Sequence, residues 1–398
     1  MTVKWVMLVP DGMADWAVPE LGGRTPLMKA RTPAMDQLAR ESVLGKVLTV
    51  PSGMYPSSDV ANMALLGYNP RQYYTGRGPI EATAMGVPLE PEDTAFRCSL
   101  ITTDGERLLD YSGGNIPTEE ARLLIHLLQE KLGTPKIAFF PGVGYRHGMR
   151  WRQGPTEVIC TPPHEMVGER LRDHYPQGDG ERTLIQLMED SYELLSAHPI
   201  NRKREDAGKR PANMIWLWGA GRAPRLEPFA LRWGRTGAVI AAVDVIRGLG
   251  RLVGLEVPTV PGATGYIDTN YAGKGEDALR MLETHDFVYV HIEAPDEAGH
   301  HGDYEAKTWA IEQIDKHIVA QIVEGLRARH EPFRLLIVPD HLTPVAKRTH
   351  AEGYVPFLLY DSRQAHPSKF LYDESILEEP HLPKIEEGYQ LIERLFAS

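Results

Sequence analysis

Four short apolar runs constrain the fold of this chain more than any other feature. They are KWVMLVP (4–10), RTGAVIAAV (235–243), DFVYVHIEA (286–294) and FRLLIVPD (333–340). Each is rich in β-branched and aromatic residues, which is typical of the buried strands of a parallel sheet. Helical patterns lie between the runs. The sequence therefore predicts an α/β fold in which helices flank a mostly parallel sheet.

One helical pattern is long enough to show which face it buries. In the segment 304–330, apolar residues recur at spacings of three and four, at Ile311, Ile314, Ile318, Ile322 and Leu326. This periodicity predicts a helix with a single apolar stripe. The stripe is expected to pack on the sheet, as in a right-handed crossover between parallel strands.

The middle of the chain carries elements of its own. Its 398 residues exceed the usual size of one domain, so two domains, or one domain with a large insertion, are expected. The segment 94–210 contains its own strand and helix patterns and ends in the charged stretch NRKREDAGKRP (201–211), which we interpret as a connector. We predict a sheet domain made of residues 1–93 and 211–398, interrupted by a smaller α/β domain at 94–210.

Composition excludes several classes of protein. A net charge of −11 argues against a nucleic-acid partner, because a phosphate backbone needs a Lys/Arg surface. The apolar runs are shorter than the ~20 residues that cross a bilayer, and the N-terminus has no signal-peptide pattern, so a cytoplasmic location without membrane contact is expected. Two cysteines, Cys98 and Cys160, provide no disulfide framework and are interpreted as buried filler.

Carboxylates and imidazoles follow the predicted strands. They are Asp11, Asp296, His300, Asp340, His341 and His350. Because ligands gather beyond the carboxyl ends of parallel strands, these residues can converge there although they are far apart in sequence. A mixed oxygen and nitrogen set suits Mn²⁺, Zn²⁺ or related ions. Six ligands suit two metals placed for phosphoryl transfer.

A pair of serines in SGMYPSSDVANMALLGY (52–68) provides a candidate nucleophile. A serine beside a metal pair could attack phosphorus and become transiently phosphorylated. The same residues have ordinary alternatives, since Ser57, Ser58 or Asp59 could cap the following helix and Asp11 could cap another. Composition alone does not choose between Ser57 and Ser58.

Motifs of other enzyme classes are missing. The chain has no GxxxxGK[ST] phosphate loop and no GxSxG nucleophile elbow. Basic residues in GYRHGMRWRQ (144–153) and WGAGRAPR (218–225) could bind an anionic substrate, because Arg holds phosphate and carboxylate through two hydrogen bonds. Solvated surface arginines are the alternative.

Several motifs together resemble one known family. They are DGMAD, PSSDVANMALLGYNP, YYTGRGPIEA, PGATGYIDTNYAGKGEDAL, EAPDEAGHHGD, and PDH followed by THAEGYVPF. The chain resembles the cofactor-independent phosphoglycerate mutases of the archaeal type, in the alkaline phosphatase superfamily, from about Val3 to about Phe357. This resemblance implies a phosphatase-like sheet domain, an inserted substrate domain, a phosphoserine intermediate and a small phosphorylated acid as substrate.

The resemblance also implies roles for individual residues. One metal would be held by Asp296, His300 and His350, and the other by Asp11, Ser58, Asp340 and His341. Ser58 would be the nucleophile, Ser57 would replace a usual glycine, and Lys274 would reach the phosphoryl oxygens. Substrate contacts are expected at Arg77, Arg146, His147 and Arg222. The implied cofactors are two divalent ions, Mn²⁺ or else Zn²⁺, Co²⁺ or Mg²⁺, and no bisphosphoglycerate.

Departures from the family pattern fall in the inserted segment. DYSGGNIPTEEA (110–121) lacks two usual arginines, at Tyr111 or Ser112 and at Asn115, and TPPHEM, YRHGM and IWLWGAG are similar to a subgroup proposed as homoserine kinases. We expect a phosphoglycerate mutase of glycolysis and gluconeogenesis. The alternatives are a homoserine kinase-like phosphotransferase, a metal-dependent phosphatase or phosphodiesterase, and a non-catalytic metal-stabilised protein. Nothing in the sequence indicates an oligomeric state.

Overall fold

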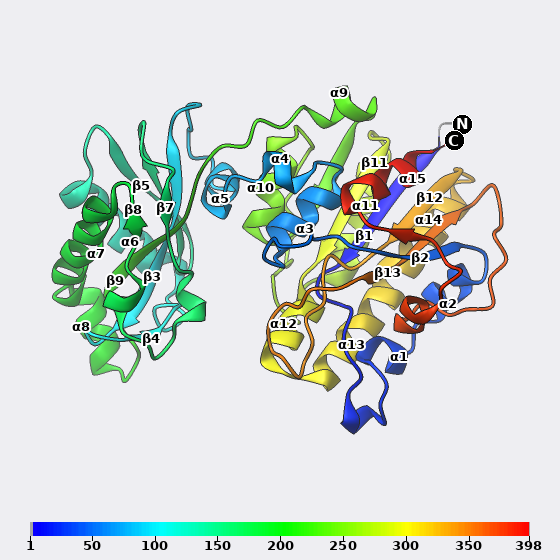
Figure 1. Cartoon of the computed structure of the whole chain (residues 1–398), viewed down its shortest axis with the longest axis horizontal. Coiled ribbons are helices and arrows are strands. Elements are labelled where there is room, and N and C mark those ends of the chain that lie inside the picture. Colours follow the sequence, from blue (N-terminus) through cyan, green and yellow to red (C-terminus); the bar gives the residue numbers. More distant parts are fainter. Residues whose placement is uncertain (1–2, 398) are drawn as a thin grey trace. The chain divides into compact units, whose positions relative to one another are not determined.

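The structure, a computed structural model, describes residues 3–397. The chain forms two compact units (Figure 1). The sheet unit contains the chain up to Tyr74 and again from Leu226 onward, and the inserted unit runs from Thr75 to Arg225. Among the described residues, no helix combines the length and the apolarity needed to span a membrane.

A seven-stranded sheet forms the centre of the sheet unit. Its strands, in spatial order, are β10 (Gly237–Ile240), β11 (Phe287–Ile292), β1 (Lys4–Pro10), β12 (Phe333–Ile337), β13 (Val355–Asp361), β2 (Val43–Val47) and β14 (Lys384–Ile385). The first four are mutually parallel, while β13 is antiparallel to both of its neighbours. The four apolar runs of the sequence are these four parallel strands, which confirms the predicted α/β fold with a mostly parallel sheet.

Helices cover both faces of this sheet, so its central strands have no solvent side. In β1, Val6 and Leu8 pack into the core on one face, and Met7 and Val9, on the other, are also fully buried. This two-sided burial explains why β1 is a continuous apolar run without alternating polar residues.

The longest apolar helix stripe packs on one face of the sheet, as predicted. That face is covered by α2 (Pro33–Ala39), α11 (Tyr271–Met281), α13 (Tyr304–Ile314) and α14 (Ala320–Ala328), with a π-helical turn at Asp315–Val319 between the last two. All five predicted stripe residues are fully buried in this core. The opposite face carries α10 (Asp244–Leu252), α15 (Leu391–Phe396) and α3 (Ser58–Leu65). The remaining helices of the unit are α1 (Pro26–Lys29), α4 (Pro70–Tyr73), α9 (Phe229–Trp233) and α12 (Ala294–His301).

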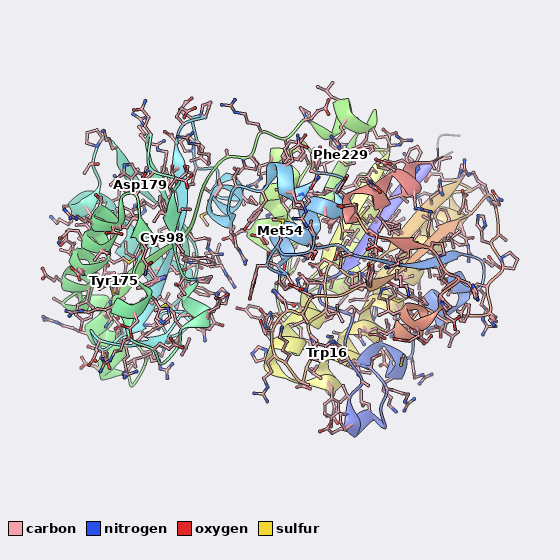
Figure 2. All side chains as sticks on the ribbon, in the orientation of Figure 1. Trp16, Met54, Cys98, Tyr175, Asp179 and Phe229 are labelled. Carbon is pink, nitrogen blue, oxygen red and sulfur yellow. The ribbon has the colours of Figure 1, made fainter. Side chains whose placement is uncertain are left out.

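The inserted unit has an antiparallel sheet of its own. It contains β3 (Thr94–Thr103), β4 (Leu108–Asp110), β5 (Ile137–Val143), β6 (Arg146–Trp151) and β9 (Met214–Arg222), and a small hairpin pairs β7 (Val158–Ile159) with β8 (Gln177–Gly178). Its helices are α5 (Arg77–Ala84), α6 (Thr118–Leu132), α7 (Glu181–Ser196) and α8 (Pro199–Asp206). Cys98 is a buried free thiol on β3 (Figure 2), and Cys160 is half-buried and also free.

The inserted unit extends beyond the predicted boundaries at 93/94 and 210/211. Helix α5 precedes the first boundary, and β9, which pairs with β3 along most of its length, follows the second. An apolar strand such as β9 fits either unit on sequence alone, because only its pairing partner shows where it belongs.

One local prediction was wrong. The first half of the supposed connector at 201–211 belongs to helix α8, whose Arg204 is buried. The Arg204 guanidinium donates hydrogen bonds to the carbonyl oxygens of Gly113 and Gly114 and pairs with Glu120 at 2.9 Å. The charged composition suggested solvent, but these distant acceptors satisfy the charge inside the unit.

Candidate metal centre and nucleophile

One strand-to-helix junction and two loops bring the predicted residues to one edge of the sheet unit. Asp11 follows β1, Asp296 and His300 lie on α12 directly after β11, and Asp340 and His341 follow β12. The last histidine, His350, lies in the loop that leads to β13. The six side chains therefore meet beyond the carboxyl ends of parallel strands, as the topology requires.

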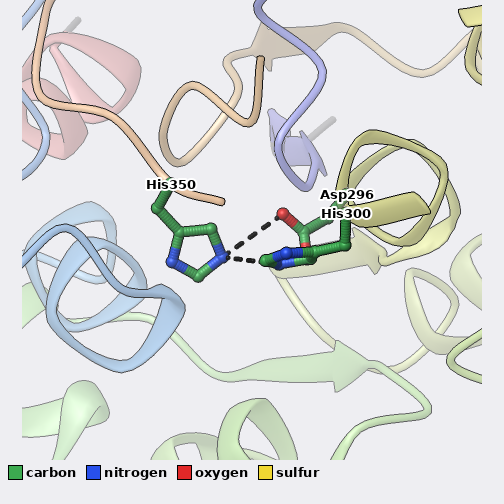
Figure 3. A group of neighbouring side chains, drawn as sticks. All are labelled: Asp296, His300 and His350. Atoms are coloured by element: carbon green, nitrogen blue, oxygen red, sulfur yellow. Dashed lines mark hydrogen bonds and ion pairs between the residues drawn. The ribbon is translucent and has the colours of Figure 1, made fainter. Parts of the chain in front are cut away.

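The first group of potential ligands is Asp296, His300 and His350 (Figure 3). The Asp296 carboxylate lies 3.1 Å from His300 Nε2 and 3.4 Å from His350 Nε2, and the two Nε2 atoms are 3.1 Å apart. Two atoms that bind one ion at ~2.1 Å, with angles of roughly 90–110°, are about 3.0–3.4 Å apart. The three side chains therefore have the spacing of ligands around a common divalent ion.

The outer nitrogens of the histidines are held by oxygen atoms. The Nδ1 atoms contact the Arg348 carbonyl (His300, 3.1 Å), the Pro56 carbonyl (His350, 2.8 Å) and the Thr343 hydroxyl (His341, 3.2 Å). Metal-binding histidines almost always have such a partner, because it fixes the tautomer and turns the other nitrogen toward the ion. The pattern leaves each Nε2 directed into the centre.

A second group surrounds Asp11, which is fully buried. Its carboxylate lies 3.0 Å from His291 Nε2 on one side and 3.5 Å from His341 Nε2 on the other. Asp340 lies 3.5 Å from His341 Nε2. Asp11 and Asp340 form a possible metal group with His291, and Asp11 forms another with Asp296 and His341.

Neighbouring groups fix Asp340 in place. The backbone N–H of Gly12 donates to Asp340 Oδ1 at 3.0 Å, and the Asn62 amide donates to Oδ2 at 2.8 Å. The Tyr289 hydroxyl donates in turn to the Asn62 side-chain oxygen. These contacts orient one carboxylate precisely enough to act as a ligand, and they tie β11 and α3 to the end of β12.

The Asp11 carboxylate, by contrast, has no hydrogen-bond donor among the described residues. Within residues 3–397, neither of its carboxylate oxygens makes a hydrogen bond. Burial, followed by the negative charges of Asp340, Glu293 and Asp296, raises the pKa of Asp11 well above its usual value. A buried carboxylate without donors is costly. A divalent cation would supply the missing partner, so the residues present fit a bound metal.

Charges in the first group are balanced differently. Burial would raise the pKa of Asp296, but the neighbouring His350 and His300 outweigh it and hold that pKa well below its usual value. Burial would lower the pKa of His300, but the hydrogen bond and charge of Asp296 raise it to about 9. Without an ion, this group therefore holds a proton where a metal would bind.

Geometry separates the two serines. Ser58 is the first residue of α3, and its Oγ lies 3.2 Å from His341 Nε2. The Ser57 hydroxyl instead donates to the Tyr55 carbonyl at 3.4 Å and makes no side-chain cap. Only Ser58 faces the metal groups, at a helix N-terminus whose N–H groups favour a bound phosphate.

Lys274 lies beside the same centre. Its ammonium is fully buried and donates to the backbone carbonyl of His291 at 2.9 Å. Burial lowers the pKa of Lys274 to about 8, although the negative charges of Glu293 and Asp11 oppose the shift. The lysine is thus a buried cation whose charge acts on Asp11 and Glu293.

Sequence reasoning missed His291 and Glu293. Both lie at this edge of the sheet, where His291 is buried and Glu293 is half-buried. Burial raises the pKa of Glu293 to about 8 and lowers that of His291 to about 3. A signal was available in DFVYVHIEA, since a histidine inside an otherwise apolar buried strand needs a polar partner.

Gly12 is required by the close approach of two loops. Its φ of +58° lies in the left-handed region, where side chains are strained. A Cβ there would lie 2.4 Å from Thr343 Oγ1 and 2.6 Å from Asp296 Oδ1. The glycine therefore allows the Asp11 loop to pass directly against the first metal group.

The predicted substrate contacts lie in the inserted unit. Arg77 contacts Glu81 at 2.6 Å and stands over the Trp218 ring. The buried Arg97 also pairs with Glu81. Burial would raise the pKa of Glu81, but Arg97 and Arg77 outweigh it and lower that pKa. Arg97 was not predicted, although a charged residue inside the strand pattern FRCSLITT could have indicated it.

The other predicted contacts differ in accessibility. Arg146 stacks over the Tyr145 ring, while the next residue, His147, is fully buried and accepts a hydrogen bond from the Gly142 N–H at 2.9 Å. Burial and the charge of Arg97 lower the pKa of His147 to about 3. Its Nε2 is also buried and makes no hydrogen bond among the described residues.

Two further features of the inserted unit are the predicted substrate contact Arg222 and a cluster of aromatic side chains. Arg222, at the end of β9, pairs with Glu92 at 2.9 Å. In the loop that departs from the family pattern, Tyr111 makes edge contacts with Tyr145 and His164. An aromatic cluster therefore occupies this part of the inserted unit.

Comparison with known proteins identifies the family. The family profile described as 2,3-bisphosphoglycerate-independent phosphoglycerate mutase matches residues 39–201. The 2,3-bisphosphoglycerate-independent phosphoglycerate mutase of Methanothrix thermoacetophila is 47% identical over 395 residues, which cover 99% of this chain and 100% of that protein.

Solved structures agree with this result. A protein from Pyrococcus horikoshii superposes with a TM-score of 0.82 at 27% identity, covering 100% of this chain and 98% of that one. The cofactor-independent phosphoglycerate mutase from Thermoplasma acidophilum gives a TM-score of 0.64 at 26% identity, covering 99% of both chains. The chain with this centre of carboxylates, imidazoles and a helix-terminal serine therefore belongs to the 2,3-bisphosphoglycerate-independent phosphoglycerate mutase family.

Proposed function

We propose that this protein is a two-metal phosphoglycerate mutase that interconverts 3-phosphoglycerate and 2-phosphoglycerate through a phosphoserine at Ser58. The observation that carries the proposal is the position of Ser58 Oγ, 3.2 Å from His341 Nε2 and at the start of a helix. A hydroxyl in that position is a nucleophile beside a metal centre. The family membership of the chain supports the same reaction.

The proposed ligands form two sets. Asp296, His300 and His350 would hold one ion, and Asp11, Ser58, Asp340 and His341 would hold the other. The mixed oxygen and imidazole donors favour Mn²⁺, with Zn²⁺, Co²⁺ and Mg²⁺ as alternatives. When bound, such ions activate a hydroxyl and neutralise charge on a phosphoryl group.

The chain's own residues supply the group transfer. Ser58 Oγ forms a bond to phosphorus as the bond from phosphorus to the 3-oxygen of glycerate breaks. The serine loses its hydroxyl proton, and the released 3-oxygen gains one. In the second half, the 2-hydroxyl of the same glycerate attacks the phosphoserine and restores the Ser58 hydroxyl. Phosphate thus moves within one substrate molecule, and no bisphosphoglycerate is needed.

Two features of the site serve this exchange. The buried Lys274 ammonium adds positive charge next to Asp11, where phosphoryl oxygens would gather. A phosphoryl group on Ser58 would also lie at the N-terminus of α3, where backbone N–H groups favour an anion. Their role is to hold the phosphoryl group while its bond to one oxygen atom breaks and its bond to another forms.

Glycerate must stay bound while Ser58 carries the phosphate. We assign this task to basic side chains of the inserted unit, with Arg77, Arg146 and Arg222 as candidates. Since His147 is buried, we propose that it supports the neighbouring Arg146 and does not itself bind substrate. Arginine suits a carboxylate because its guanidinium forms two parallel hydrogen bonds.

The cellular setting follows from the reaction. We propose a cytoplasmic enzyme of glycolysis and gluconeogenesis that acts on small phosphorylated acids. The net charge of −11 disfavours nucleic acid as a partner. The two named relatives described above are phosphoglycerate mutases, which favours the mutase over the homoserine kinase-like and phosphatase alternatives.

The test uses two adjacent serines as a matched pair. Mn²⁺-loaded protein is incubated with 3-phosphoglycerate and no nucleotide, and 2-phosphoglycerate is followed by phosphorus NMR. We expect conversion by the wild type, a loss of at least about 10³-fold in Ser58→Ala, and near wild-type turnover in Ser57→Ala. Full turnover by Ser58→Ala would refute the covalent route. Phosphohomoserine formed from homoserine and ATP, with 3-phosphoglycerate unchanged, would refute the mutase assignment.

A further inference from the structure

His291 occupies a position on β11 that the proposed ligand sets leave unexplained. Its imidazole is 1% exposed, and its Nε2 lies 3.0 Å from Asp11 Oδ2. Despite this distance, neither atom makes a hydrogen bond within the described part of the chain. The two atoms are close but do not point at each other, as a hydrogen bond requires.

Ligands of a common ion have this geometry. Each of two ligand atoms points at the ion, and when they subtend a right angle at ~2.1 Å they lie about 3.0 Å apart. Asp340 completes the arrangement, because one atom each of Asp11, His291 and Asp340 lies within 4.8 Å of the other two. The three side chains come from the ends of three adjacent strands, β1, β11 and β12.

The outer side of the ring follows the pattern of the other histidines. His291 Nδ1 faces Glu293 Oε2 at 3.9 Å, so a carboxylate lies behind the imidazole while Nε2 faces the centre. In His300, His341 and His350, an oxygen likewise lies behind the ring. His291 is thus oriented like the proposed ligands.

Unsatisfied polar atoms concentrate at this point. Within residues 3–397, both oxygens of Asp11, both ring nitrogens of His291 and Oε2 of Glu293 are buried without a hydrogen bond. Each such atom is costly to bury. A cation held between Nε2 and the carboxylates satisfies the inner atoms together, which a proton on any one of them does not.

We infer that His291 is a further protein ligand of the second divalent ion, bound through Nε2 beside Asp11 and Asp340. The inference rests on the proposed function in one respect, namely that the protein holds two ions. The competing explanation is that His291 only donates a hydrogen bond that positions Asp11. A ligand changes the coordination of the ion itself, whereas a donor does not, so the two are distinguishable.

The experiment replaces the native ion with Co²⁺, whose visible spectrum reports its coordination. Wild type, His291→Ala and His291→Asn are titrated with Co²⁺ while absorbance and bound metal are measured. The Asn side chain can still donate a hydrogen bond to Asp11, but its amide nitrogen does not bind metals. The control is His285→Ala, because His285 precedes the same strand but pairs with Glu256 instead.

We expect two Co²⁺ per wild-type chain and one tight Co²⁺ in both His291 variants. The second ion should bind at least about 100-fold more weakly, beyond most effects of outer partners, and its visible bands should change. His285→Ala should match the wild type. Wild-type affinity and spectrum in His291→Asn would overturn the inference. Three ions in the wild type and two in His291→Ala would also overturn it, because His291 would then serve a separate site.

The outcomes separate this inference from the proposed function. A wild-type protein that binds no Co²⁺ would refute both the proposed two-metal function and the role of His291. A wild type that binds two ions and converts 3-phosphoglycerate, together with unchanged second-site binding in His291→Ala, would remove only the role of His291. Far-ultraviolet circular dichroism of the metal-free variants shows whether they are folded, and His291→Asn retains most of the side-chain volume if His291→Ala is not.

Discussion

Lys307, on α13, forms a buried ion pair whose loss should destabilise the sheet unit. Its ammonium is fully buried, lies 2.7 Å from Asp15 Oδ2 and donates to the Thr343 carbonyl at 2.9 Å. The ion pair joins α13 to the loop after β1, and the hydrogen bond to Thr343 joins α13 to the loop after β12. Lys307→Met keeps the length of the side chain and removes its charge and its donors.

The magnitude follows from what the substitution leaves behind. Asp15 keeps hydrogen bonds from the N–H groups of Trp16, at 2.7 Å, and Val345, at 3.2 Å. Its buried charge, however, loses its only described cationic partner within residues 3–397. Breaking a buried pair in this way costs about 3–5 kcal/mol, and the retained N–H donors favour the lower part of that range. We expect a loss of about 3–4 kcal/mol, or roughly 6–16 °C in Tm for a domain of this size.

The assay measures the free energy of unfolding of the sheet unit, from urea and thermal unfolding of the metal-free protein. Lys316→Met, at an exposed lysine a few residues farther along, is the control and should stay within about 0.5 kcal/mol. Asp15→Asn combined with Lys307→Met should recover part of the loss, because no unpaired charge remains. A cost below about 1 kcal/mol for Lys307→Met would refute this reasoning.

Two further predictions concern the metal centre. Gly12→Ala should cost about 2–4 kcal/mol, from left-handed strain of about 1–2 kcal/mol and overlap with Thr343 and Asp296, and it should weaken the first metal site. The control is Gly22→Ala, at φ +69° with no atom nearby, which should show the backbone strain alone. If Gly12→Ala and Gly22→Ala had equal effects on the free energy of unfolding and on metal affinity, the predicted overlap with Thr343 and Asp296 would be contradicted. Since Asp296 raises the pKa of His300 to about 9, their pairing stabilises the metal-free fold below about pH 6.5 and is lost as pH rises through about 9. A metal must displace this proton, so affinity in chelator competition should rise up to about tenfold per pH unit toward pH 9, and a flat profile from pH 6 to 9 would contradict it.

The central sheet and the strand-end residues were predictable because local sequence and topology agree there. A parallel strand buried on both faces is a short apolar run, and a polar residue at its end has only one edge of the sheet to occupy. The sequence therefore predicted Asp11, Asp296 and Asp340 as site residues. It did not predict His291, because this histidine lies inside an apolar run and its neighbour Asp11 comes from another strand.

Other features depend on contacts that no local pattern contains. Helix α8 looked like a solvated connector, since its buried Arg204 is satisfied by carbonyl groups of Gly113 and Gly114. The family resemblance favoured Ser58 over Ser57, and the physical reason for that choice is the position of His341. Composition offers two equivalent hydroxyls, and only the fold turns one of them toward an imidazole.

The strand order also governs when this protein can become functional during its synthesis. Strand β1 is made first, yet its partners β11 and β12 pair Trp5 with Phe287 and Arg334, near the far end of the chain. At about 5–20 residues per second, β1 waits roughly 15–65 s for both neighbours. The inserted unit is contiguous and can fold in the interval, whereas the apolar first strand remains without these two partners. Metal capture is therefore among the last events in the maturation of the chain.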